Sequence, residues 1–141
     1  MRIVDRQDCL RKMYQVVGAA MVVYNELGNG LSEQIYQECL SIVCSEKGIP
    51  WEREKLLKMY FHGQELTKVY KADFVCFDDL IVELKAVSEL SNDHRGQLLN
   101  YLRITQSNAG LLINFGHPSM LISERYVFNP SKSQYEYIRY K

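Results

Sequence analysis

The sequence has 141 residues, a formal net charge of zero at pH 7 and 47% hydrophobic residues. This length fits one domain with its own hydrophobic core, and the balanced charge excludes a protein that coats nucleic acid through bulk positive charge. A local basic groove is still compatible with it. The apolar stretch at residues 16–24 is too short to span a bilayer, and the N-terminus has no signal-peptide pattern, so we expect a cytoplasmic protein that does not contact a membrane.

Two helices are predicted in the first third of the chain. Apolar residues recur at spacings of three and four over residues 7–27, and the glycine-rich turn at residues 28–30 ends this helix. A second apolar stripe predicts a helix over residues 32–47, which Gly48 and Pro50 terminate.

The remainder of the chain has strand patterns around one further helix. The predicted strands are residues 55–61, 69–77, 80–87, 109–115, 120–128 and 134–140. A turn is expected over residues 62–66 and a hairpin turn at Asp78 and Asp79. Helical spacing returns over residues 91–106, with Asn92 or Asp93 as the N-cap. This order predicts an α/β fold, with residues 1–141 forming a single domain that has a mixed central β-sheet flanked by helices.

Residues 81–87, IVELKAV, place two ionisable side chains in a strand that is otherwise apolar. Glu83 and Lys85 share a face because alternate residues of a strand point the same way. Asp73 lies on the preceding strand and comes close to Glu83 if the two strands pair. Adjacent carboxylates repel unless a cation or proton lies between them, and oxygen ligands suit Mg²⁺ or Mn²⁺. We therefore predict that Asp73 and Glu83 bind a metal and that Lys85 orients a water or stabilises charge on a phosphate. The alternative is a structural ion pair between Glu83 and Lys85.

These residues resemble the signature of a known superfamily. Asp73 followed by Glu83-Leu84-Lys85 is similar to the D…(D/E)xK pattern of the PD-(D/E)XK nucleases, with Ala72 where the name has Pro, a change that many members share. Residues 30–36, GLSEQIY, resemble the GxxExxY motif of a bacterial family assigned to that superfamily. The resemblance extends over roughly residues 16–130, and it implies a restriction-endonuclease-like core.

The resemblance also implies roles for individual residues. Asp73 and Glu83 would bind Mg²⁺ or Mn²⁺, and Glu33 would complete the metal site from its helix. Lys85 would be the catalytic lysine. Gln97 and Tyr101 match a QxxxY element that lines the active site in some relatives, and Gln97 is predicted to act in catalysis. Their i, i+4 spacing puts both on one helical face.

Each of these residues also has a structural interpretation. Glu33 is a favourable acid for the first turn of a helix. Gln97 fits a solvent-exposed position and Tyr101 a core position. From the GxxExxY motif, Tyr36 fits a packing role and Gly30 a backbone turn.

The resulting prediction is metal-dependent hydrolysis of phosphodiester bonds in nucleic acid, with DNA as the first choice of substrate. The alternative is a binding module on the same fold that holds nucleic acid or protein without turnover. The intact set of Asp73, Glu83 and Lys85 favours the enzyme, whereas the neutral net charge favours the binding module. The chain is small for a nuclease with its own specificity module, so self-association or a targeting partner protein is expected.

Other polar residues are expected to lie outside the site. The histidines His62, His94 and His117 form no metal-spaced pair, and the four cysteines contain no CxxC motif, which favours buried, reduced thiols. Arg95 and Arg103 are expected on the solvated face of a helix, with contacts to a nucleic-acid backbone as the alternative.

Overall fold

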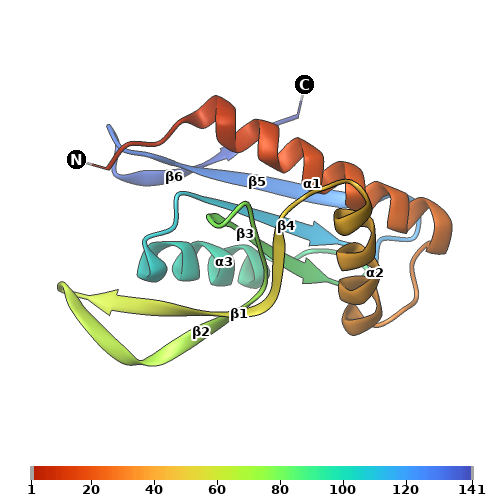
Figure 1. The fold of residues 1–141 in the computed structure, drawn as a ribbon, viewed down its shortest axis with the longest axis horizontal. Helices are drawn as coiled ribbons and strands as arrows, with labels where there is room; N and C mark the ends of the chain where they lie inside the picture. Colours follow the sequence, from red (N-terminus) through yellow and green to blue (C-terminus); the bar gives the residue numbers. More distant parts are fainter. Residues whose placement is uncertain (1, 141) are drawn as a thin grey trace.

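A six-stranded sheet with helices on both faces forms the protein in a computed structural model that describes residues 2–140 (Figure 1). The helices are α1 (Arg6–Leu27), α2 (Glu33–Glu46) and α3 (Asn92–Thr105). The strands are β1 (Trp51–Phe61), β2 (Gln64–Cys76), β3 (Leu80–Lys85), β4 (Ala109–Asn114), β5 (Ile122–Asn129) and β6 (Gln134–Ile138). The strands follow one another across the sheet in chain order. β3 and β4 pair in parallel and the other neighbours pair antiparallel, so the predicted mixed α/β fold is confirmed.

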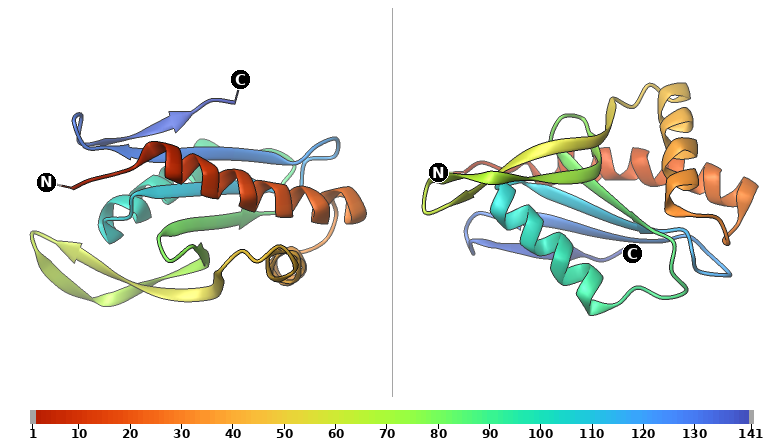
Figure 2. Two further views of the ribbon diagram at one scale, coloured as in Figure 1. Left: turned by 45° about the horizontal axis from the view of Figure 1, so that its top comes forward. Right: turned by 90° about the horizontal axis from the view of Figure 1, so that it is seen from below.

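The helices divide the core into two layers (Figure 2). α1 and α2 cover one face of the sheet, where Val82 and Leu84 of β3 are buried. α3 covers the other face, where Ile81 and Leu112 are buried. Because α3 connects the two parallel strands, it supplies the crossover that parallel pairing requires.

None of the helices within residues 2–140 is both long and apolar enough to cross a membrane.

The structure corrects the predicted boundaries of the first hairpin. β1 begins at Trp51 rather than residue 55, and β2 begins at Gln64 rather than residue 69. The predicted turn over residues 62–66 is confined to His62 and Gly63, both of which have positive φ. Half-buried and exposed residues alternate along β1, and many of the exposed residues are charged. Because one face of β1 is in contact with solvent, its sequence has little of the apolar pattern that predicts a strand.

The N-cap of α3 is Ser91, so the prediction of Asn92 or Asp93 was wrong. The Ser91 hydroxyl accepts from the His94 backbone N–H at 3.3 Å, and His94 Nδ1 accepts from the Ser91 N–H at 3.1 Å. This is a capping box in which histidine takes the place of the usual Glu or Gln. His94 therefore stabilises the helix end, as an ordinary structural residue.

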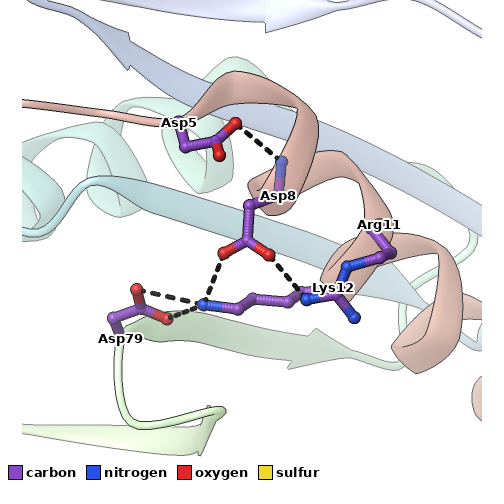
Figure 3. A network of polar contacts seen from close by, with 5 residues as sticks. All are labelled: Asp5, Asp8, Arg11, Lys12 and Asp79. Carbon is purple, nitrogen blue, oxygen red and sulfur yellow. Dashed lines mark hydrogen bonds and ion pairs between the residues drawn. The ribbon is translucent and has the colours of Figure 1, made fainter.

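The turn between β2 and β3, at residues 77–79, is tied to α1 (Figure 3). Lys12 Nζ lies 3.3 Å from Asp79 Oδ1 and 3.0 Å from Asp8 Oδ2. The N-cap of α1 is Asp5, whose carboxylate accepts from the Asp8 N–H. These contacts fix the start of β3, the strand that carries the predicted catalytic residues, against the helical layer.

Asn114 at the end of β4 holds the segment that follows β3. It is fully buried, and its Oδ1 accepts from the backbone N–H groups of Val87 and Gly116, both at 3.0 Å. Its Nδ2 donates to the Val87 carbonyl at 2.8 Å, while the Phe115 N–H donates to the Lys85 carbonyl. The contact between β3 and β4 therefore continues beyond the last paired residues, which fixes the backbone around Lys85.

Removing this amide should destabilise the protein. Asn114→Ala leaves buried backbone groups without partners, and we expect the free energy of unfolding to fall by about 2–3 kcal/mol. Urea denaturation measures the change. Asn25→Ala, at an exposed position of α1, is the matched control and should unfold as the wild type does. Equal stability of the two variants would contradict this role.

Candidate active site

Asp73 and Glu83 lie where the regular pairing of β2 and β3 stops. The last paired residues before this point are Phe74 and Val82. Beyond them, side chains replace the backbone ladder. The Leu84 N–H donates to Asp73 Oδ2 at 2.8 Å, and the Asp73 N–H donates to Glu83 Oε1 at 3.3 Å. Asp73 and Glu83, called the carboxylate pair from here on, therefore each accept from a backbone N–H of the neighbouring strand, and they lie close together as the sequence predicted for paired strands.

The strand alternation puts Glu83 and Lys85 on the face that α3 covers. Val82 and Leu84 pack beneath α1 and α2, so their odd-numbered neighbours point the other way. Both charged side chains are half-buried. Among the residues described, Lys85 forms no ion pair and no side-chain hydrogen bond. The described residues therefore contain no ion pair between Glu83 and Lys85, which was the structural alternative.

Tyr70 is a residue of this site that the sequence analysis missed. It is buried, and its hydroxyl donates to Glu83 Oε1. Its ring stacks on Tyr101 of α3, with ring centroids 3.7 Å apart and planes 11° from parallel. Nothing in the local sequence separates Tyr70 from the nine other tyrosines, because its role depends on a contact across to the next strand.

The carboxylate pair carries unfavourable electrostatics when no cation is bound. Burial, followed by the negative charge of Asp73, raises the pKa of Glu83 to about 8. Burial and the nearby Glu83 charge likewise raise the pKa of the Tyr70 phenol. Glu83 therefore binds a proton near neutral pH, which is one of the two ways in which adjacent carboxylates avoid repulsion. A bound cation is the other.

One oxygen of each carboxylate is free for a ligand. Within residues 2–140, Asp73 Oδ1 and Glu83 Oε2 accept no hydrogen bond from the protein, and the one buried side-chain polar atom without a partner belongs to Arg125. Mg²⁺ is commonly bound through one or two carboxylates, with water and substrate phosphate as its other ligands.

Glu33 does not join this pair. It is exposed at the first residue of α2. Residues 2–140 hold no cluster of three or more His, Cys, Asp or Glu side chains arranged to bind a metal ion. The role of Glu33 as a third ligand stays a prediction.

The other residues of the GxxExxY motif have structural surroundings. Tyr36 is buried and stacks on Phe115 with ring centroids 4.5 Å apart. Its hydroxyl donates to the Gly28 carbonyl at 2.6 Å and accepts from the Leu31 N–H at 3.2 Å. Gly30 has φ = 108°, a conformation that favours glycine. Tyr36 and Gly30 therefore shape the turn between α1 and α2, in agreement with their structural interpretation.

Gln97 and Tyr101 lie side by side in one groove, as their spacing predicted. The groove lies between α3 and β1 and has a volume of about 490 Å³. Tyr101 connects it to the carboxylate pair through the stacked ring of Tyr70. Gln97 is exposed in the groove, and its catalytic role stays a prediction.

The remaining candidates are structural. Arg95 is held by Glu124 of β5, with Nε 2.8 Å from Oε1, so it is not a free residue on the solvated helix face. Arg103 is exposed and donates to Asn100. The four cysteines are free thiols, three of them buried, as expected.

The chain matches the model of a known protein family. A sequence profile described as the PD-(D/E)XK nuclease superfamily matches residues 11–125. Among solved structures, one titled "Crystal structure of SSO0001" is similar, with a TM-score of 0.49, 17% identity and coverage of 83% of this chain. The aligned part is 61% of that protein, so the chain spans less than two thirds of its length. No curated protein sequence matches significantly.

The narrower assignment to the GxxExxY family stays a prediction. The superfamily profile, however, covers most of the chain and includes the carboxylate pair and Lys85. The chain therefore belongs to the PD-(D/E)XK nuclease superfamily.

Proposed function

We propose that the protein hydrolyses phosphodiester bonds in DNA with the help of Mg²⁺ or Mn²⁺. The observation that carries the proposal is the carboxylate pair. Each acid accepts a hydrogen bond from a backbone N–H of the neighbouring strand, each has one oxygen to which no N–H or O–H group of residues 2–140 donates, and the pKa of Glu83 is raised to about 8. A protein that tolerates such repulsion between half-buried carboxylates is expected to use it, since strongly perturbed acids gather at functional sites.

The donor set fits a hard divalent cation. Asp73 and Glu83 supply two carboxylate oxygens, which suits Mg²⁺ with water and phosphate as further ligands. When bound, the metal would lower the pKa of a coordinated water and offset negative charge on the phosphate. Glu33 belongs to the proposal as the third ligand, the role that the family resemblance implies.

The chain's own side chains would orient the reactants. Lys85 shares the face of Glu83 and has no partner among the described residues, so its ammonium is available to a water or a phosphate oxygen. Tyr70 holds one oxygen of Glu83 and leaves the other for the ligand. Gln97 would approach the substrate from α3.

The wider setting belongs to the same proposal. Membership of a nuclease superfamily supports a nucleic-acid partner, and the assignment to the GxxExxY family would place the protein in bacteria. A cytoplasmic location and either self-association or a targeting partner complete the proposal.

Metal binding and cleavage test the proposal together. We expect Mn²⁺ titrated into the wild type by calorimetry to bind, with release of a proton near pH 7 because Glu83 must lose its proton. Glu83→Ala should not bind. The same preparations should be assayed for cleavage of single- and double-stranded DNA with Mg²⁺. Glu33→Gln, assayed alongside, tests the third ligand through its Mn²⁺ affinity.

The outcomes separate the candidate functions. Binding with cleavage supports the nuclease. Binding without cleavage supports a metal site in a protein that has lost turnover or lacks its partner. A wild type that binds no Mn²⁺ contradicts the proposal and favours the binding module.

A further inference from the structure

The groove between α3 and β1 has a chemistry that differs from that of the carboxylate pair. It is lined by three amide side chains (Asn92, Gln97 and Asn100), the carboxylate of Asp93, the ring of Tyr101 and the thioether of Met59. Its volume of about 490 Å³ lies in the range of pockets that take small organic ligands. We call it the amide groove.

The side chains that line the amide groove do not favour a phosphate. No basic side chain lines it, and Asp93 contributes a negative charge. A neutral, flat ligand with hydrogen-bonding edges fits better, because an amide presents a donor and an acceptor side by side. Amides pair in this way with the edges of nucleobases, and a carboxylate accepts from an exocyclic amino group such as that of cytosine.

Two arginines orient the amides. Arg95 Nη1 donates to Asn92 Oδ1 at 3.0 Å, and Arg103 Nη1 donates to Asn100 Oδ1 at 2.7 Å. Each asparagine therefore has its carbonyl oxygen engaged and keeps its NH₂ group for a ligand. The amide of Gln97 has no hydrogen bond to any described residue, so both its donor and its acceptor are available.

Tyr101 and Tyr70 separate the groove from the carboxylate pair. Tyr101 lines it and stacks on Tyr70 at 3.7 Å, and Tyr70 donates to Glu83. A strand whose phosphate lies at the carboxylate pair would have to place a base beyond these two rings to occupy the groove. That base enters only if it is unstacked from its neighbours, because duplex bases are covered on both faces.

We infer that the amide groove binds a single unpaired nucleobase with an exocyclic amino group. The substrate would then be single-stranded or locally unpaired DNA. The inference rests on the proposed function for the place of the phosphate, but the chemistry of the groove is independent of cleavage.

Binding without metal tests the inference. The probes are labelled single strands of about ten nucleotides, made of deoxycytidine, of thymidine or of abasic sites, in buffer with EDTA so that no cleavage occurs. Fluorescence anisotropy gives the dissociation constants. We expect the wild type to bind the cytosine strand about 10-fold more tightly than the abasic strand and several-fold more tightly than the thymine strand.

Two variants test whether the base preference comes from the amide groove. Gly96→Leu fills the groove: Gly96 lines it, and an added Cβ meets no atom within 4 Å. The variant should stay folded, since leucine is a better helix former than glycine, and it should bind all three strands equally. Gln97→Ala should reduce the preference in part. Gln7→Ala, an exposed glutamine on α1, is the matched control and should keep the wild-type preference.

Three results overturn the inference. These are equal affinity of the wild type for the three strands, a cytosine preference that survives Gly96→Leu, and no binding of any strand, which would leave the groove to a protein partner. Cleavage is assayed separately with Mg²⁺. A base preference without cleavage leaves this inference standing while the proposed function fails, and cleavage without a base preference does the reverse.

Discussion

Lys85→Met should reduce DNA cleavage by about 10³-fold while the fold and the affinity for Mn²⁺ stay close to those of the wild type. The loss of a positioned charge that acts on the reacting phosphate typically costs two to three orders of magnitude in rate. Lys85 makes no ion pair or side-chain hydrogen bond to the described residues, so its removal breaks no structural contact. Single-turnover cleavage assays with saturating metal measure the rate, and calorimetry measures the affinity.

A matched variant tests whether the loss of any lysine charge from the sheet reduces cleavage. Lys71→Met removes an exposed lysine from β2 in the same sheet and should cleave at nearly the wild-type rate. Lys85→Arg keeps the charge but changes its geometry, so we expect only partial activity. A Lys85→Met protein with wild-type cleavage would show that the lysine is not part of the mechanism.

The parts of the site that follow from strand geometry could be predicted from sequence. Period-two alternation put Glu83 and Lys85 on one face, and a hairpin turn brought Asp73 to Glu83. Both inferences use only neighbouring strands and a short turn. The four-residue spacing of Gln97 and Tyr101 likewise predicted that they share a groove.

The parts that depend on distant contacts could not be predicted. Tyr70 reaches Glu83 across strands and Tyr101 across layers, and neither contact has a local pattern. The same is true of Asn114 in β4, a polar residue that binds the backbone of the segment after β3. Ser91 was overlooked as the α3 N-cap because two other good capping residues follow it directly.

The metal-free protein should lose stability as the pH rises from about 5 to about 8. The pKa of Glu83 is raised from 4.5 to about 8 by burial and by Asp73, so the folded state keeps a proton that the unfolded state releases in this interval. The free energy of unfolding falls wherever the folded state binds more protons, and it becomes level above the folded pKa. The raised pKa corresponds to at most about 5 kcal/mol. Urea denaturation in EDTA at several pH values measures the change.

Glu83→Gln should remove most of this pH dependence. A neutral amide can still accept from Tyr70 and from the Asp73 N–H, and it carries no charge for Asp73 to repel. The variant should therefore match the wild type near pH 5 and exceed it near pH 8.5. Glu26→Gln, at an exposed position of α1, should keep the wild-type slope.

The effect of Mn²⁺ on the stability of the wild type and of Glu83→Gln tests the same group in a second way. A cation that binds only the folded state stabilises it by RT ln(1 + [L]/Kd), where [L] is the concentration of free cation, so Mn²⁺ should restore the stability of the wild type near pH 8. It should have little effect on Glu83→Gln, which lacks one of the two carboxylates. A wild type with constant stability between pH 5 and 8.5, or a Glu83→Gln variant with the wild-type slope, would mean that Glu83 is not the group that titrates. The repulsion within the carboxylate pair would then no longer be the reason for a metal at this site.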